Sequence, residues 1–559
     1  MNEPQESIAV GSPIFRDNKL AQCARDSGQV AAWRAALEHG PAAAATSVDG
    51  EFAVALRESS GRTFLAVDRF GIRTLCYRIV GDQLRFALRA DALVDATEAA
   101  ALDPQAIFDY VYFHVIPSPR TIFKDVQRVP PGHYVLFENG GLTVAPYWTP
   151  AFDDDSPMLL AAEKNRFRQM LQESVAAQLD GTKAACFLSG GTDSSTVAGM
   201  IGLATGKPAA TYSIGFEADG YDEMEFARIT ARHFKTEHHE YYVTPDDLVA
   251  GIPAVAAHYD QPFGNSSALP AYYCARMAHD DGVTRLLAGD GGDELFGGNT
   301  RYAKQRVFGA YQRIPEGLRR GALEPLFRVP AIARAPLLRK GASYIDQARV
   351  PMPDRLQTYN LLGLLGFGAV FTDDFLHMVD TAAPARQQRE VWGGAVTDDL
   401  VNRMLAFDWR YTLGETDLPK VVGTAQLANV SVGFPMLDAR LLDYALRMPP
   451  DCKLKGLRLR WFFKEALRGF LPDETIAKKK QGFGLPFGVW ATRHDGLRRL
   501  AADSLGSLST RGIVRPDFLK ELLEERLPSH PGYYGEMIWI LMMLEQWIQV
   551  HQPRLGCIA

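Results

Sequence analysis

The N-terminal stretch of the chain alternates short apolar runs with turns. The segments EFAVALRE, RTFLAVDRF, LRFALRAD and HYVLFENGGLTVAPYW carry this pattern, which is typical of short β-strands. The ENGG tetrapeptide lies between two apolar runs and predicts a hairpin. The acidic, proline-containing stretch TPAFDDDSPML follows and suits an exposed linker. We therefore predict a strand-rich domain over residues 1–152 and a second domain over residues 153–559.

Beyond the linker, short apolar runs are separated by amphipathic helical segments. AACFL precedes a helix that starts at Asp193, ATYSIGF precedes DEMEFARITARHF, and RLLAG precedes another turn. This alternation predicts an α/β fold with a doubly wound parallel sheet, in which ligands bind at the carboxyl ends of the strands. The remainder is mainly helical by the same criterion, and MIWILMMLEQWIQV predicts a buried core helix.

The composition is that of a globular protein, with 559 residues, 47% hydrophobic and 23% charged. The net charge of -6 provides no general positive field for nucleic acid. The N-terminus lacks a signal-peptide pattern, and the longest apolar run, residues 537–544, is too short to span a bilayer. The six cysteines form no CxxC pair, which disfavours structural zinc or a disulfide scaffold. We expect a cytoplasmic protein with no nucleic-acid or membrane partner.

The segment CFLSGGTDSSTVAGM places a glycine- and hydroxyl-rich turn between an apolar strand and a helix. Its glycines let the backbone approach a ligand, its hydroxyls donate hydrogen bonds, and the N-terminal amides of the helix face an anion. No GKS or GKT follows, so the turn is not a Walker A loop. Because a carboxylate repels phosphate, Asp193 is suited to holding Mg²⁺ against a leaving pyrophosphate, with an Asx cap on the helix as the alternative. The predicted pyrophosphate-binding residues are Ser189, Gly190, Gly191, Asp193, Ser194 and Ser195.

A second glycine-rich turn, LLAGDGGDELFGGNTRY, also follows an apolar strand. Its carboxylates, Asp290, Asp293 and Glu294, repel one another unless a metal ion or a substrate amine compensates them. An exposed acidic turn is the alternative, but the pairing with the first turn favours a functional site.

A third segment, LPDETIAKKKQGFGLPFGVW, joins a cationic run to an aromatic, glycine-rich turn. Lys480 in this run could neutralise charge that develops on an acyl-phosphate transition state, whereas a solvated lysine run is the alternative. In contrast, the spacing of His233, His238 and His239 in ARHFKTEHHE gives no shared face, so we predict no histidine metal site there.

These motifs resemble the asparagine synthetase family of ATP-pyrophosphatases, including its relatives that close β-lactams or the macrolactam of lasso peptides. The resemblance covers nearly the whole chain after residue 48 and includes DGEFAVAL, AVDRFGIRTLCY, SGGTDSS, GDGGDELFGG, FPMLD and KKKQGFGLP, in that order. It implies that ATP activates a carboxylate as an acyl-adenylate with release of pyrophosphate, and that an amine then attacks to form an amide. ATP and Mg²⁺ are the implied substrate and cofactor.

The resemblance also implies roles for single residues. By matching position, Lys480 is the catalytic lysine, and Asp290 is the residue important for forming the adenylate or for handling the incoming amine. Asp193 and Asp293 would hold Mg²⁺. The implied nucleotide contacts are Leu188, Ile214, Ala288 and Gly289.

The chain departs from the family pattern at two places. Glutamine-dependent members begin with a cysteine directly after the initiator methionine, whereas this chain has Asn2, and its first cysteine, Cys23, is internal. We therefore predict a degenerate, Ntn-hydrolase-like glutamine amidotransferase domain that has lost its glutaminase activity. In DLPKVVGTAQLANVSVGFPMLD, Val422 and Gly423 replace the aspartate and arginine of the family's KVDR motif, which removes two charges from the expected acyl-substrate side.

The leading hypothesis is an AMP-forming carbon–nitrogen ligase that adenylates aspartate or an aspartate-like acyl group and uses ammonia or an amine. The alternative is a cyclase that joins the carboxylate and amine of a peptide or natural-product precursor, with a partner protein where the precursor is a peptide. A tRNA-modifying enzyme would need a basic RNA surface or a pair of catalytic cysteines, and a non-catalytic nucleotide-binding regulator would have lost the carboxylates and the lysine. The expected partners are small-molecule or peptide carboxylates and amines. The sequence leaves open whether the chain forms a homodimer.

Overall fold

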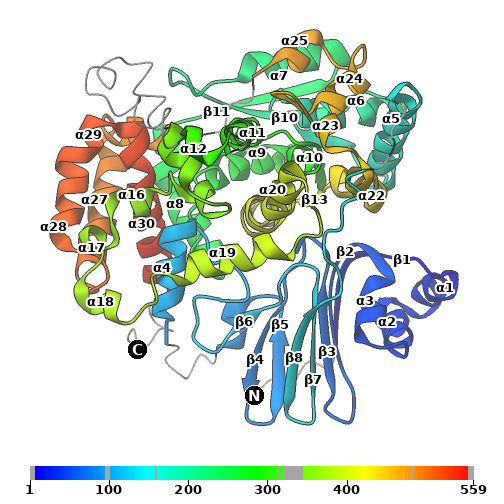
Figure 1. The fold of residues 1–559 in the computed structure, drawn as a ribbon, viewed down its shortest axis with the longest axis horizontal. Coiled ribbons are helices and arrows are strands. Elements are labelled where there is room, and N and C mark those ends of the chain that lie inside the picture. The colour runs from blue at the N-terminus through cyan, green and yellow to red at the C-terminus, as the bar shows by residue number, and fades with distance from the viewer. Residues whose placement is uncertain are drawn as a thin grey trace.

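The computed structural model describes residues 7–94, 101–155, 157, 160–312, 314–319, 344–479 and 484–551. Figure 1 shows an N-terminal β-rich part at the bottom, a parallel-sheet α/β part above it, and a group of C-terminal helices along the left side. This arrangement confirms the predicted fold class.

The N-terminal part consists of two antiparallel sheets with three short helices on one face. The strands are β1 Ser7–Phe15, β2 Val48–Arg57, β3 Thr63–Val67, β4 Cys76–Val80, β5 Gln83–Ala87, β6 Gln127–Arg128, β7 His133–Glu138 and β8 Gly141–Pro146, and the helices are α1 Asn18–Ser27, α2 Gln29–Leu37 and α3 Pro41–Thr46. One sheet has the order β1-β2-β3-β7-β8 and the other β5-β4-β6. Along β2, Phe52 and Val54 pack with Trp33 of α2, whereas Ala53 and Ala55 face the second sheet. Successive side chains of the strand thus point to opposite faces, and both faces of this part of β2 are buried.

The predicted hairpin is confirmed. Strands β7 and β8 pair antiparallel, and Asn139 and Gly140 between them have φ values of 52° and 77°. Positive φ at both central positions is the geometry of a tight hairpin turn that Asn-Gly favours.

The second part is built on a parallel sheet whose strand order places a ligand site. Its strands are β9 Ala185–Phe187, β10 Ala210–Phe216, β11 Glu237–Val243, β12 Arg285–Leu287 and β13 Ser431–Gly433, and its helices include α5 Leu160–Ala177, α6 Thr192–Thr205, α7 Met224–Phe234, α8 Pro245–His258, α9 Ala268–Asp280 and α21 Leu418–Leu427. The order is β11-β10-β9-β12-β13, and every pair is parallel. The chain therefore runs outward from β9 to β11 and returns to β12 on the other side of β9. Right-handed crossovers then place α6 and α7 on one face and α8 and α9 on the other, with the switch point between β9 and β12.

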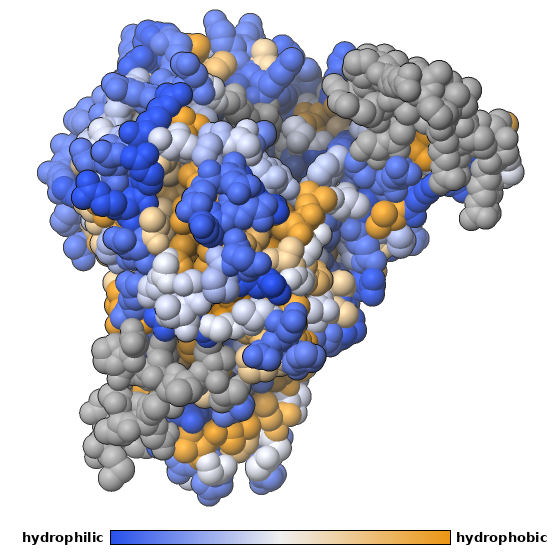
Figure 2. All heavy atoms as spheres, turned by 90° about the vertical axis from the view of Figure 1, so that its left-hand side faces the viewer, coloured by the Kyte–Doolittle hydropathy of each residue, from blue (hydrophilic) through white to orange (hydrophobic). Residues whose placement is uncertain are grey.

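The C-terminal part is helical, and its long last helix lies at its centre. Its main elements are α26 Phe487–Ala491, α27 Asp495–Ser509, α28 Pro516–Glu521, η6 Leu522–Arg526 and α30 Pro531–His551. In α30 the residues from Met537 to Leu544 are all buried, which confirms the predicted core helix. The outer face of this region is mostly hydrophilic with small hydrophobic patches (Figure 2). Within the described ranges, no helix combines the length and apolar character that crossing a bilayer requires.

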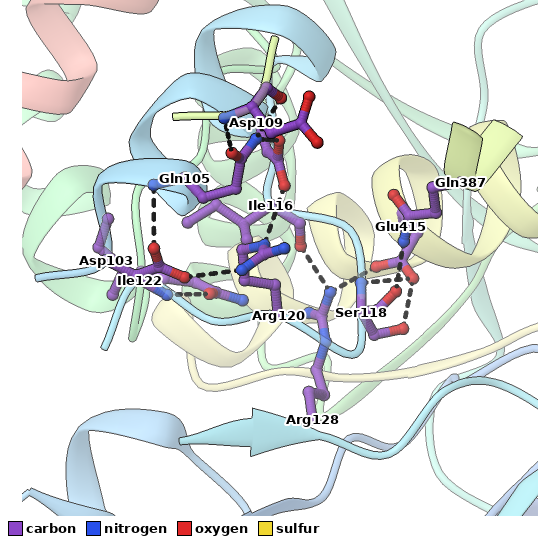
Figure 3. Close-up of polar contacts among 12 residues, drawn as sticks. Asp103, Gln105, Asp109, Ile116, Ser118, Arg120, Ile122, Arg128, Gln387 and Glu415 are labelled. Atoms are coloured by element: carbon purple, nitrogen blue, oxygen red, sulfur yellow. Dashed lines mark hydrogen bonds and ion pairs between the residues drawn. The ribbon is translucent and has the colours of Figure 1, made fainter. Parts of the chain in front are cut away.

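A buried ionic network joins the N-terminal part to the helices (Figure 3). Glu415, in the π-helical segment Trp409–Asp417, accepts hydrogen bonds from the Ser118 amide at 3.1 Å and the Ser118 hydroxyl at 2.7 Å. It also pairs with Arg128 and Arg410. Burial would raise the pKa of Glu415, but the two guanidinium groups and the Ser118 donors outweigh burial and lower it. Glu415 is therefore a charged group that fixes the relative placement of the two parts.

Candidate active site

The first glycine-rich turn lies between β9 and α6. Gly190 has φ of 67°, and a Cβ at this position would lie 2.3 Å from the backbone carbon of Phe226, so only glycine fits. The Ser194 hydroxyl accepts a hydrogen bond from the Ser189 amide at 3.1 Å. Gly191 is the N-cap of α6 and makes no side-chain cap. The first amides of this 14-residue helix are therefore available to an anion, as the sequence predicts.

The second turn packs directly against the first. It runs from the end of β12 into α10 Gly292–Phe296. A Cβ at Gly289 would lie 2.8 Å from the Ser194 amide nitrogen, and one at Gly292 would lie 2.0 Å from Oδ1 of Asp193. The glycines of this turn therefore allow the carboxylates of the two turns to approach one another.

A buried arginine lies between the two carboxylates that the resemblance assigns to Mg²⁺. Arg460 Nη1 donates to Asp193 Oδ2 at 2.6 Å and to Asp293 Oδ1 at 2.9 Å, and its side chain is 4% exposed. Its guanidinium also stacks on the ring of Phe463 at 3.8 Å. Burial opposes the charge of Arg460, but the two carboxylates outweigh it and raise the pKa. Asp193 therefore serves this ion pair and not an Asx cap of α6.

These residues also suit a magnesium ion. Carboxylate oxygens are the ligands that Mg²⁺ prefers, and both carboxylates converge on one point, which here holds Arg460 Nη1. Asp193 and Asp293 would hold the ion, whose charge would be set against the phosphates of the nucleotide. Arg460 is the cation with which a metal ion must share this pair of carboxylates.

Asp290 belongs to a second charge cluster at the same turn. Its Oδ1 lies 4.0 Å from Nζ of Lys420, and that ammonium donates to Asp417 at 2.9 Å. Burial raises the pKa of Asp290 to about 6, Lys420 opposes this rise, and Asp417 adds to it. Asp290 therefore changes its charge near neutral pH, which suits a group that handles protons during catalysis.

Both turns line one cavity of about 1180 Å³ at the carboxyl ends of β9 and β12. Lys478 and Lys479 line its far side, and Lys478 Nζ lies 3.2 Å from Glu223 and donates to the Ser189 carbonyl at 3.4 Å. The cationic run thus reaches the first turn. Lys480 lies outside the described residues, so its catalytic role stays a prediction.

Most of the predicted site residues share this cavity. Three of the predicted residues do not line it: the Ser195 hydroxyl is buried against Thr230 at 2.9 Å, Ala288 is buried in the core, and Gly190 packs on Phe226. They support the turns from behind. The predicted residues that line the cavity are Leu188, Ser189, Gly191, Asp193, Ser194, Ile214, Gly289, Asp290 and Asp293.

Sequence reasoning missed Arg460, Lys420 and Thr192. Arg460 and Asp193 are 267 residues apart in the chain, and Lys420 and Asp290 pair only in three dimensions. The Thr192 hydroxyl accepts a hydrogen bond from Arg460 at 2.7 Å. Thr192 lies within the SGGTDSS motif, so the sequence does contain a signal for it. For Arg460 no local pattern gives a signal.

Val422 and Gly423 face a different cavity from the one expected. Both line a cavity of about 350 Å³ between the N-terminal part and the parallel-sheet part, together with Arg128 and Glu415. A Cβ at Gly423 would lie 2.6 Å from the ring of Tyr259, so that ring fills the space of a side chain. The two uncharged residues, Val422 and Gly423, therefore lie at the contact between the two parts and do not line the cavity that holds Asp193.

The three histidines contact different partners. His233 Nε2 contacts the Phe470 carbonyl at 2.9 Å, and His238 Nδ1 contacts the Thr211 hydroxyl at 3.0 Å. His239 lies near Glu237 and Asp281, a geometry that could hold a metal ion. Lys183, however, donates to Asp281 at 2.6 Å and to Glu237 at 3.3 Å, and so already neutralises these carboxylates.

Two protein families and several curated relatives match this chain. A family described as asparagine synthase matches residues 166–549, and one described as a glutamine amidotransferase domain matches residues 24–148. Asparagine synthetase [glutamine-hydrolyzing] 1 of Bacillus subtilis is 25% identical, over 92% of this chain and 80% of its own. Amidase chry2 of Gibberella zeae is 24% identical over 79% of this chain and 70% of its own, and amidase chyE of Penicillium rubens is 24% identical over 84% and 76%.

Proposed function

Because this chain belongs to the asparagine synthase family, a family of ATP-dependent amide-forming ligases, we propose that it adenylates an aspartate-like carboxylate and joins it to ammonia or an organic amine, without hydrolysing glutamine. Pyrophosphate and AMP are the other products.

One observation carries this proposal: both glycine-rich turns line a single cavity at the switch point of the sheet. The first turn offers amides and hydroxyls to an anion, and the second offers carboxylates to a cation. A site that must stabilise a leaving pyrophosphate needs both kinds of group at once. Mg²⁺ between Asp193 and Asp293 would supply charge neutralisation for that step.

The cysteines support the proposed absence of glutamine hydrolysis. Such hydrolysis needs a reactive thiolate. In the described part of the chain, Cys76, Cys186, Cys274 and Cys452 are buried, and burial raises the pKa of each thiol. Cys23 lies within α1, where it packs against the helices of the N-terminal part.

The test is pyrophosphate release from ATP and Mg²⁺ with aspartate, in parallel with ammonium chloride or glutamine, with asparagine quantified. We expect release with ammonium chloride and none with glutamine. Hydroxylamine added without an amine traps an acyl-adenylate as a hydroxamate, which separates the first half-reaction from the second. Turnover with glutamine would refute the proposed loss of glutaminase, and failure to trap any hydroxamate across a panel of amino-acid and peptide carboxylates would refute the adenylation.

A further inference from the structure

The cavity that both glycine-rich turns line is called the ATP-type cavity below. A second cavity of about 470 Å³ lies among the helices next to it. It is bordered by α4 Pro104–Phe113, α11 Thr300–Gln312, α16 Leu361–Leu365, α20 Leu400–Asp408, the π-helical segment and α30. In Figure 1, α4, α16 and α30 lie near one another left of the centre. We refer to this space as the aromatic cavity because its walls include the rings of Tyr112, Phe113, Phe407, Tyr411 and Tyr533.

One carboxyl group in the aromatic cavity lacks a permanent cation. Glu536 of α30 lies 3.7 Å from Nδ1 of His114, and no lysine or arginine in the described ranges forms an ion pair with it. Burial raises the pKa of Glu536 to about 7 and lowers that of His114 to about 4. At neutral pH the imidazole is therefore uncharged and does not compensate the carboxylate.

The remaining polar groups of the aromatic cavity do not supply that charge. Arg301 lines it, but its guanidinium pairs with the buried carboxylate of Asp408, which also accepts from Tyr302. The Tyr411 hydroxyl is buried and makes no hydrogen bond within the described chain. A buried hydroxyl without a partner and a carboxyl without a cation are both completed by a donor that carries positive charge.

The aromatic cavity and the ATP-type cavity are lined by adjoining stretches of the chain. Tyr411 and Thr412 line the aromatic cavity, whereas Asp417, at the other end of the same π-helical segment, lines the ATP-type cavity. Five residues of helix span roughly 8 Å at the α-helical rise. Likewise, Thr300 lines the ATP-type cavity and the adjacent Arg301 lines the aromatic one.

We propose that the aromatic cavity binds an organic ammonium ion, the amine substrate of the ligase, with its positive charge at Glu536 and its apolar body between the aromatic rings. Aromatic faces attract cations, and the half-exposed Glu536 carboxylate adds a charge of opposite sign beside them. Ammonia has no apolar body to fill this space, so the inference makes an alkyl or aryl amine the preferred donor and ammonia a poorer one. It rests on the proposed function in naming the ligand a substrate, whereas its binding can be measured without turnover.

The test is isothermal titration calorimetry on the full chain, without ATP, using 2-phenylethylammonium as the probe. The neutral isostere 2-phenylethanol and ammonium chloride serve as comparison ligands. We expect saturable 1:1 binding of 2-phenylethylammonium and at least tenfold weaker binding of both comparison ligands. Equal affinity for the ammonium ion and the alcohol would overturn the proposal, as would the absence of saturable binding.

Variants locate the binding site. Glu536→Gln should weaken 2-phenylethylammonium at least tenfold and leave 2-phenylethanol unchanged, while the control Glu524→Gln, 63% exposed on the C-terminal helices, should change neither. Should Glu536→Gln fail to fold, Tyr411→Phe is the second variant, with a smaller loss of affinity expected. Unchanged affinity in a folded Glu536→Gln variant would overturn the assignment. Binding in a chain that forms no hydroxamate would refute the ligase and keep the site, whereas hydroxamate formation without binding would refute the site alone.

Discussion

The two cavities differ in how their carboxylates are compensated. In the ATP-type cavity, three carboxylates that the sequence predicts face a cation of the chain: Asp193 and Asp293 face Arg460, and Asp290 faces Lys420. In the aromatic cavity, Glu536 faces an uncharged imidazole. Removing a charge from water without a partner is costly. Glu536 avoids part of this cost because its side chain is 41% exposed, and this exposure also leaves it accessible to a cation from outside the chain.

This difference indicates how each cavity responds to its ligand. The ATP-type cavity is preorganised, and a metal ion must compete with a cation that is already present. The aromatic cavity is completed only when a cation arrives. Substitutions can test this comparison. They remove either a cation of the chain in the ATP-type cavity, Arg460 or Lys420, or the carboxylate Glu536 of the aromatic cavity.

The largest expected effect is that of Asp193→Asn on catalysis. Asp193 pairs with Arg460 and is the predicted holder of Mg²⁺ against the leaving pyrophosphate. Its loss therefore removes a ligand of the metal ion and one of the two carboxylates that position Arg460. We expect pyrophosphate release to fall by about 1000-fold or more, with an unchanged circular dichroism spectrum. Asp280→Asn, 66% exposed on α9, is the matched control and should keep full activity. A normal rate in Asp193→Asn would contradict the assigned site.

Arg460→Met should cause the next largest effect, on stability. It leaves two buried carboxylates without their cation, and breaking a buried pair in this way costs about 3–5 kcal/mol. Urea denaturation measures the loss, and Mg²⁺ should restore more stability to the variant than it adds to the unaltered chain, because the freed carboxylates can hold it. Arg440→Met removes an exposed arginine that also joins two carboxylates, Glu173 and Asp438, and should cost about 1 kcal/mol or less. Equal losses of stability in the two variants would contradict the claim that the buried ion pairs of Arg460 stabilise the chain more than the exposed ion pairs of Arg440.

Asp193 and Arg460 also differ in whether the sequence predicts them. The turns at Ser189 and Asp290 follow from local patterns, since a glycine-rich turn after an apolar strand has its own signature within about ten residues. The order of the parallel strands then brings both turns to one switch point. Arg460 left no such signature, because its role depends on a contact across 267 residues. Glu536 likewise lies in an apolar helix pattern, where only the packing of α4 and α30 shows that its carboxyl lacks a cation.

Lys420→Met should shift the pH dependence of catalysis. The pKa of Asp290 is raised by burial to about 6 and held down by Lys420, so losing the ammonium should raise it further, by about one unit. Where ionised Asp290 acts, the rising limb of the rate against pH then moves to higher pH, and activity at pH 6.5 falls by about threefold. Lys520→Met, 73% exposed, is the control. A profile that stays in place would show that the ionisation of Asp290 does not limit the rate.

The smallest expected effect is that of Glu536→Gln on stability, and it sharpens the comparison most. Because the pKa of Glu536 is raised from about 4.3 in the unfolded chain to about 7 in the folded one, the folded state binds the extra proton between these values. The stability of the unaltered chain therefore falls as pH rises through this window, and the variant lacks this loss.

Glu536→Gln should accordingly be more stable than the unaltered chain at pH 8 and equal to it or less stable at pH 4. The side chain is 41% exposed to solvent, and solvent screening keeps the difference below about 1 kcal/mol. Thermal unfolding at both pH values measures it. Adding 2-phenylethylammonium at pH 8 should reverse the order, since the ammonium ion stabilises only the chain that retains the carboxylate. A stability difference that ignores both pH and the amine would mean that Glu536 is already compensated, and the contrast between the two cavities would disappear.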